Sequence, residues 1–154
     1  TEGKHTLGFK INGKEWVPCV DLYALAATLR PIDASLTESD GSNALSMVGH
    51  YFRWSDGDST NNTYGFWFRP LHLGVVAPHE LLGCSFNFDQ SYKGVFENKW
   101  SLPESRDGFH LEILKIDTAK NIISGVFEAV LAPKNGTDTL YITDGRFDVT
   151  YYPQ

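Results

Sequence analysis

Apolar and polar positions alternate with a period of two along much of the chain, which is typical of β-strands with one buried face. Residues 7–11 show this alternation first, with Leu7, Phe9 and Ile11 as the apolar set. Asn12-Gly13 follows directly. An Asn-Gly pair between two alternating segments favours a two-residue turn, because both of its residues adopt positive φ. We therefore expect a β-hairpin over residues 6–18.

The same alternation predicts further strands in the middle of the chain, at 32–36, 45–52, 64–69, 81–88 and 95–100. Trp67, within the run GFWF, is predicted to be a core residue. Between two of these strands, the segment 55–62 (SDGDSTNN) is polar throughout and has nothing to bury, so it is predicted to be a loop.

The last third of the chain has the most regular pattern. Strands are predicted at 109–116, 122–131 and 140–151, with turns at 119–121 and at Asn135-Gly136. The parity of the apolar positions reverses across Asp144-Gly145. An extra residue at this pair would restore the facing of the side chains, so we expect a β-bulge there.

About nine or ten short strands joined by tight turns indicate an all-β fold, an antiparallel β-sandwich. A β-barrel of the lipocalin-like kind is the alternative. Residues 20–30 are ambiguous: they form either one short helix near 21–29, ended by Pro31, or an irregular connection between strands. We find no repeat and no linker, so residues 1–154 are assigned to a single domain.

The composition indicates a folded domain and disfavours some classes of partner. The 154 residues are 42% hydrophobic and 14% aromatic, which is enough to build a core. The net charge of −6 and the absence of a basic stripe disfavour nucleic acid as a partner. No run of about 18 apolar residues occurs, as a transmembrane helix requires.

We find no catalytic pattern and therefore expect a protein that is not an enzyme. A G-x-S-x-G sequence is absent, and Cys84 lies within a strand pattern where a buried structural cysteine is expected. Acidic residues gather at turns, where they hydrogen-bond the backbone. The DGDSTNN segment is similar to the start of a calcium loop but lacks the sixth-position glycine and the closing glutamate. We expect no metal and no cofactor.

Aromatic residues that flank loops are the strongest candidates for ligand contacts. Trp54, Tyr64 and Trp100 are the predicted ligand-binding residues, because exposed aromatic faces stack on sugars or contact partner proteins. Packing in a two-layer core is the alternative for each. For the two cysteines, Cys19 and Cys84, a disulfide and a pair of buried free thiols are both open.

Three segments together resemble a known group of proteins: FKINGKEW (9–16), ISGVFEAVL (123–131) and ITDGRFDVTY (142–151). This combination resembles small exported lipoproteins of Bacteroidetes bacteria, whose families have no known function. The resemblance implies a β domain in the periplasm or at the outer membrane and cell surface. The membrane contact would be a lipid anchor on a cysteine upstream of this chain. An exported location would favour a Cys19–Cys84 disulfide.

These observations favour a non-catalytic binding module for a glycan, a peptide or a partner protein. A structural or accessory lipoprotein without a ligand is the first alternative. A small-ligand-binding β-barrel is the second, and it requires an apolar cavity at the centre of the fold.

Overall fold

The computed structural model describes residues 4–20, 30–39, 41–55, 58–89, 98–103, 108–134 and 137–153. For 20, 39, 52–55, 58–61, 88–89 and 98–99 it describes the backbone alone. Every regular element in these residues is a β-strand, which confirms the predicted all-β class. The predicted short helix near 21–29 lies outside the described residues. Among the residues that are described, no helix has the length and hydropathy needed to cross a membrane.

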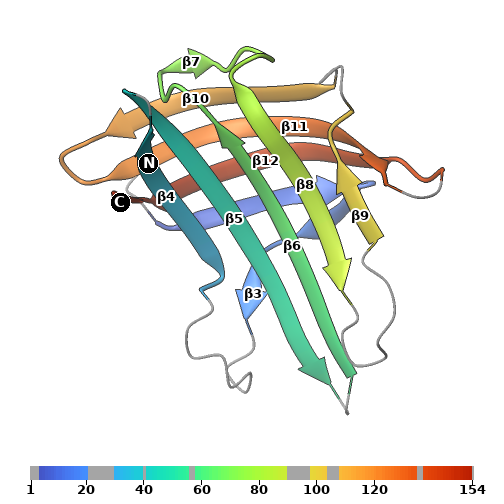
Figure 1. The fold of residues 1–154 in the computed structure, drawn as a ribbon. Helices are drawn as coiled ribbons and strands as arrows, with labels where there is room; N and C mark the ends of the chain where they lie inside the picture. The colour runs from blue at the N-terminus through green and yellow to red at the C-terminus, as the bar shows by residue number, and fades with distance from the viewer. Residues whose placement is uncertain are drawn as a thin grey trace.

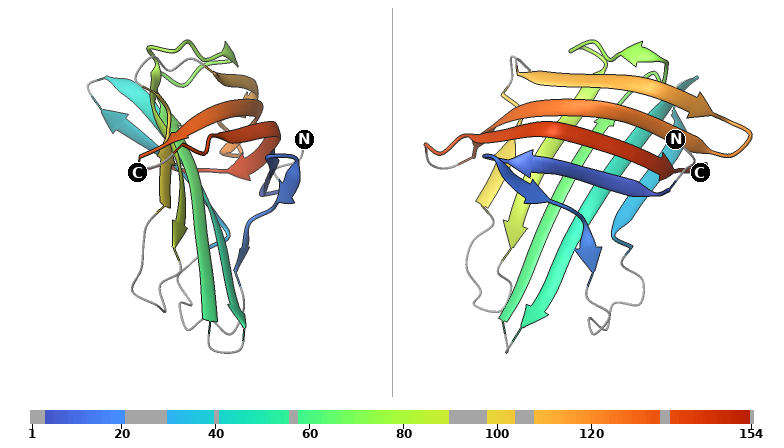
Figure 2. Two further views of the ribbon diagram at one scale, coloured as in Figure 1. Left: turned by 90° about the vertical axis from the view of Figure 1, so that its right-hand side faces the viewer. Right: turned by 180° about the vertical axis from the view of Figure 1, so that it is seen from behind.

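The strands form two layers that cross one another (Figures 1 and 2). The first layer contains β4 (Ile32–Ser39), β5 (Ser42–Ser55), β6 (Asp58–Phe68), β8 (Leu81–Asp89) and β9 (Asn98–Ser101). The second layer contains β10 (Phe109–Asp117), β11 (Ile122–Pro133), β12 (Leu140–Thr150), β1 (Thr6–Ile11) and β2 (Lys14–Trp16). Two short strands, β3 (Cys19–Val20) and β7 (Gly74–Val75), pair with β5 and β10 respectively.

The two layers belong to one continuous, curled sheet. At one end, β11 pairs with β9 through Ala132 and Ser101. At the other, the chain leaves β12 and forms β13 (Tyr152–Pro153), which lies parallel to β4. The result is a curled half-barrel, a form between the two architectures that the sequence suggests.

The predicted amino-terminal hairpin is confirmed. Strands β1 and β2 pair through Ile11 and Lys14, with Asn12 and Gly13 as the two turn residues. Their φ angles are 47° and 80°, the positive values that the Asn-Gly pair was expected to supply. The turn is also tied to β12, since the amide of Tyr141 donates a 2.9 Å hydrogen bond to Oδ1 of Asn12.

The predicted β-bulge at Asp144-Gly145 is also confirmed. The register of β12 shifts here against both of its neighbours, β1 and β11, and Asp144 has a φ of 55°. Ile142 and Phe147 therefore both face the core although they are an odd number of residues apart. Gly145 is required because a Cβ atom at this position would overlap the backbone oxygen of Phe127.

The predicted polar loop at 55–62 is wrong for the residues of this segment that the structure describes, 55 and 58–62. β5 continues to Ser55, β6 begins at Asp58, and the two strands pair without interruption from there to Leu45 and Phe68. The polar side chains misled the prediction because strand backbone groups pair with each other whatever the side chains are. Figure 1 shows this β5–β6 hairpin extending well past the second layer.

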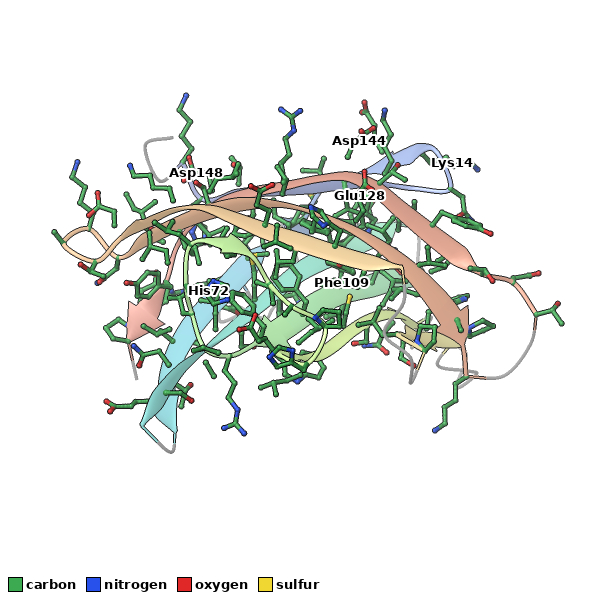
Figure 3. All side chains as sticks on the ribbon, turned by 90° about the horizontal axis from the view of Figure 1, so that it is seen from above. Lys14, His72, Phe109, Glu128, Asp144 and Asp148 are labelled. Carbon is green, nitrogen blue, oxygen red and sulfur yellow. The ribbon has the colours of Figure 1, made fainter. Side chains whose placement is uncertain are left out.

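Aromatic rings from both layers fill the space between them. Phe127 on β11 stacks on Tyr64 of β6 with ring centroids 5.4 Å apart, and it also contacts Phe66 at 5.4 Å. Phe9 of β1 joins the same cluster, 4.6 Å from Tyr64. Figure 3 shows side chains crowding the region between the layers, with Phe109 among them. The space between the two layers, where they cross, is therefore filled by these side chains.

Candidate functional site

Trp67 points away from the core, so the prediction that it is a core residue is wrong. Its neighbours Phe66 and Phe68 are both 0% exposed, whereas Trp67 is 38% exposed. Successive side chains of a strand point to opposite faces, so β6 cannot bury three aromatic residues in a row. The indole therefore lies on the outer face of the first layer.

A bulge in β8 shapes the surface around Trp67. Trp67 pairs with Gly83 and Phe68 with Leu81, which leaves Leu82 without a partner on β6. The extra residue turns Leu81 into the core and Leu82 outward, where it is 41% exposed. Trp67 and Leu82 thus form a small apolar area on an outer face.

The indole of Trp67 lies across the backbone of Gly83. A Cβ atom added at Gly83 would overlap the ring, at Cζ2 and Cε2, so a side chain at 83 would push the ring away. On β5, the residue paired with Trp67 is Ser46, which is also small. We call the Trp67 ring with Gly83 below it and Ser46 beside it the Trp67 platform.

The Trp67 platform has the chemistry of a stacking surface. One side of the ring rests on Gly83, so the opposite side is the one available to solvent and to a ligand. Ser46 and Gly83, its cross-strand neighbours, carry no charge, and Ser46 offers a hydroxyl at the edge. A flat apolar face bordered by a neutral hydroxyl suits a flat, neutral, hydroxylated molecule. The alternation of Tyr64, Phe66 and Phe68 was the signal in the sequence that could have identified Trp67.

Of the predicted ligand-binding residues, Tyr64 is placed where a ligand has no access. Its side chain is 0% exposed and stands in the aromatic core on the inner side of β6. The thiol of Cys84 donates a 3.2 Å hydrogen bond to its hydroxyl. Burial raises the pKa of Tyr64 well above its usual value. The ligand-binding assignment of Tyr64 is therefore corrected to a structural one.

Trp100 and Trp54 are placed differently from Tyr64. Trp100 is partly buried on β9, where its ring lies 6.1 Å from Phe86 and its Nε1 donates a 2.9 Å hydrogen bond to the backbone oxygen of Asp138. The backbone of Trp54 pairs with Ser59 near the tip of the β5–β6 hairpin. The side chain of Trp54 lies outside the described part of the structure. Neither residue adjoins the Trp67 platform in the strand register.

Cys19 and Cys84 are both free thiols, so the disulfide alternative is not realised. Cys19, on β3, pairs with Tyr51 of β5. Cys84, on β8, is level with Met47 of β5 but two strands away from it, on the far side of β6. Four residues along the strand and three strand spacings across the sheet separate them by about 19 Å, against about 7 Å at most for a disulfide. Cys84 is 2% exposed, and burial raises the pKa of its thiol to about 12.

A histidine–glutamate pair fixes the loop that carries β7. Nε2 of His72 lies 3.0 Å from Oε2 of Glu80, and Nδ1 lies 2.9 Å from the backbone oxygen of Leu73. The Leu73 carbonyl and the Glu80 carboxylate raise the pKa of His72 above 6.5. The His72 contact, followed by the amide of Ala77, lowers the pKa of Glu80 below 4.5. The described residues contain no group of three or more histidine, cysteine or acidic side chains placed to hold a metal ion.

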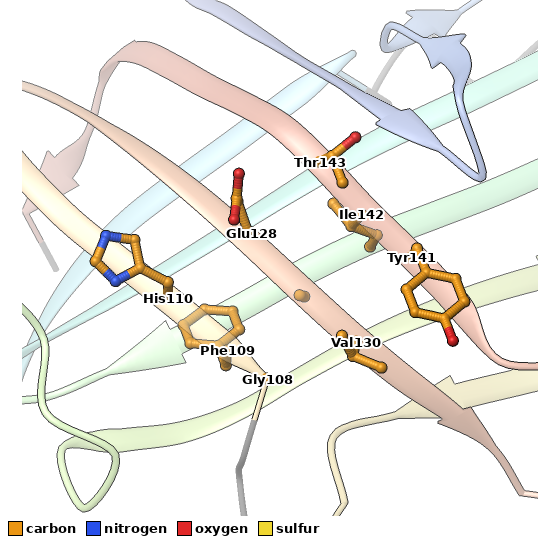
Figure 4. Close-up of a pocket in the computed structure, with 9 residues that line it drawn as sticks. Gly108, Phe109, His110, Glu128, Val130, Tyr141, Ile142 and Thr143 are labelled. Carbon is orange, nitrogen blue, oxygen red and sulfur yellow. The ribbon is translucent and has the colours of Figure 1, made fainter.

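Two of the hollows among the described residues lie on the outer face of the second layer. The smaller, of about 270 Å³, includes His110 of β10, Glu128 of β11 and Thr143 of β12 among its lining residues (Figure 4). His110 and Glu128 are cross-strand partners. The larger hollow lies further along the same strands, around Ser124. The sequence pattern gave no signal for either hollow, because side chains from three or four strands form each one.

Comparison of the chain with models of protein families, with curated proteins and with solved structures found no match.

Proposed function

We propose that this chain is a non-catalytic binding module that holds a neutral carbohydrate on the Trp67 platform. The observation that supports this proposal is the outward indole of Trp67, which rests on Gly83 and is 38% exposed. A pyranose ring has one flat face of C–H groups and hydroxyls around its edge. The face of C–H groups matches the face of the Trp67 indole, and the hydroxyls at the edge match the hydroxyl of Ser46.

The chemistry around the ring favours a carbohydrate over a charged peptide. Neither cross-strand neighbour of Trp67 carries a charge that would select an ionic partner. Gly83 has no side chain and Ser46 has a small one, so neither cross-strand neighbour is large enough to cover the ring. A protein partner that uses Leu82 as well as Trp67 is the competing occupant, and the experiment below separates the two.

The location we infer is the exported, lipid-anchored one. It is supported by the resemblance of 9–16, 123–131 and 142–151 to exported lipoproteins. An extracellular position would give the platform access to polysaccharides. Metabolic labelling with radioactive palmitate tests this inference in cells that express the full-length gene product. A lipoprotein becomes labelled, and an unlipidated protein does not.

Affinity electrophoresis tests the platform itself. The purified domain is run through gels that contain mixed-linkage β-glucan, galactomannan, arabinoxylan or starch. We expect at least one polysaccharide to slow the wild type and Trp67→Ala to abolish the effect. Loss of a central tryptophan contact costs about 2 kcal/mol or more, or about 30-fold in Kd.

The matched control is Tyr141→Ala, because Tyr141 is an aromatic residue on the outer face of the other layer and, at 56%, is more exposed than Trp67. It should bind like the wild type, and Trp67→Phe should bind with intermediate strength. Circular dichroism checks that each variant is folded. The proposal is wrong if no polysaccharide retards the wild type, or if Trp67→Ala is retarded as strongly. Binding of a protein partner through Leu82 without any polysaccharide binding would also overturn it.

A further inference from the structure

The larger hollow on the outer face of the second layer has a volume of about 500 Å³. Its residues come from four strands, β1, β10, β11 and β12 (Figure 2), and include Thr6, Leu114, Ser124, Val126, Arg146 and Asp148. Its size falls in the range of sites for small molecules. It is on the other layer from the Trp67 platform.

Ser124 gives this hollow a polar group that has no partner. The residue is 2% exposed, and its Oγ is buried without a hydrogen bond. A buried hydroxyl is nearly always paired, because it otherwise loses its hydrogen bonds to water without replacement. Trp16 and Asn62 also have an unpaired buried polar atom, but neither lines this hollow. An unpaired donor that lines a hollow indicates a group that a ligand would satisfy.

Two opposite charges line the hollow, and Lys115 of β10 is the other cross-strand partner of Ser124. Arg146 and Asp148 are two residues apart on β12, so they share a face and their Cα atoms are about 7 Å apart. In the strand register, Asp148 is opposite Ser124 and Arg146 is opposite Val126. A guanidinium binds a carboxylate through paired hydrogen bonds, and a carboxylate binds an ammonium. Opposite charges at this spacing suit a molecule that has both charges close together.

The remaining wall is apolar. A register shift in β10 between Ile113 and Lys115 leaves Leu114 outside the regular pairing, and Leu114 is 55% exposed. Leu114 and Val126 both line the hollow, on neighbouring strands. An aliphatic group bound here would be covered by these two side chains while its charged end reached β12.

From this combination we propose that the hollow binds a small aliphatic zwitterion, an α-amino acid such as leucine. Its carboxylate pairs with Arg146 and accepts a hydrogen bond from the Ser124 hydroxyl. Its ammonium group lies beside the carboxylate of Asp148, which also has an interaction within the protein, and its side chain packs on Leu114 and Val126. This proposal uses none of the residues of the Trp67 platform, so either proposal can fail without the other.

Isothermal titration calorimetry with L-leucine, leucinamide and N-acetyl-leucine tests the proposal. Leucinamide lacks the carboxylate and N-acetyl-leucine lacks the ammonium group. We expect leucine to bind and each analogue to bind at least about tenfold more weakly, which corresponds to one lost charged contact. Absence of leucine binding, or equal binding of either analogue, would overturn the assignment to a zwitterion.

Ser124→Ala is the sharpest variant, because it removes an unpaired hydroxyl and leaves the fold intact. We expect its melting temperature to equal or exceed that of the wild type, while its affinity for leucine falls by about tenfold. Thr143→Ala is the matched control, since Thr143 is on β12 but lines the other hollow. Unchanged leucine affinity in Ser124→Ala, or an equal loss in Thr143→Ala, would refute the role of Ser124.

Discussion

Phe127 is the residue whose replacement best tests the packing between the layers. It lies on β11, is 1% exposed, and its ring contacts Tyr64 and Phe66 of the first layer at 5.4 Å. It also contacts Phe9 and Phe147 of the second layer, at 5.7 and 6.3 Å. Phe127→Ala would therefore leave a cavity whose walls are rings held by both layers.

The expected loss of stability is large. Replacing a buried phenylalanine by alanine costs about 3–5 kcal/mol, and the cost is highest where neighbours cannot collapse into the cavity. Rings fixed from both layers make this such a site, so we expect about 4–5 kcal/mol for Phe127→Ala. For a domain of this length each kcal/mol lowers the Tm by about 2–4 °C. The expected decrease in Tm is therefore about 8–20 °C.

Urea denaturation followed by far-ultraviolet circular dichroism measures this loss. Glu128→Ala is the control, because Glu128 is the next residue on β11 but points outward and is exposed. Its stability should stay within about 0.5 kcal/mol of the wild type. A loss below about 1.5 kcal/mol for Phe127→Ala, or equal losses for the two variants, would refute the assignment of the core between these layers.

Two further predictions concern titratable groups. A thiol reagent such as Ellman's should detect Cys19 alone in the native protein at neutral pH, because Cys84 is buried and burial raises the pKa of its thiol to about 12. In guanidinium chloride the reagent should detect both cysteines. Two reactive thiols in the native protein would contradict this prediction. The His72–Glu80 pair should stabilise the fold fully between pH 4.5 and 6.5. Its contribution is lost as the pH rises through the raised pKa of His72 or falls through the lowered pKa of Glu80. The difference in Tm between the wild type and His72→Ala should be largest in that window, and a difference independent of pH would exclude the ion pair as its cause.

Local features of this fold could be predicted from the sequence because their causes are local. Asn12-Gly13 requires positive φ at two successive residues, and the structure has a two-residue turn there. Asp144-Gly145 lies where the apolar parity reverses, and the structure has a bulge there. In both cases the residues that form the feature also carry its signal, so no knowledge of neighbouring strands was needed.

The candidate sites could not be predicted in the same way. Tyr64 and Trp67 are both aromatic residues of one strand, and the sequence assigned each to the wrong face. Leu81 and Leu82 show why: the pairing of β8 with β6 determines which of them is the extra residue, and hence which is buried. Ser124 and Arg146 share a hollow only because β11 and β12 pair in one register.

Local patterns were therefore sufficient to predict that the chain forms β-strands, where the tightest turns fall and where one bulge interrupts the alternation. Pairing between strands was needed to establish which face of each strand is buried, how far β5 and β6 extend, and which side chains form a surface. Alternation defines two faces of a strand without saying which of them is inside. That choice depends on register between strands far apart in the chain, and a shift of one residue exchanges the two faces.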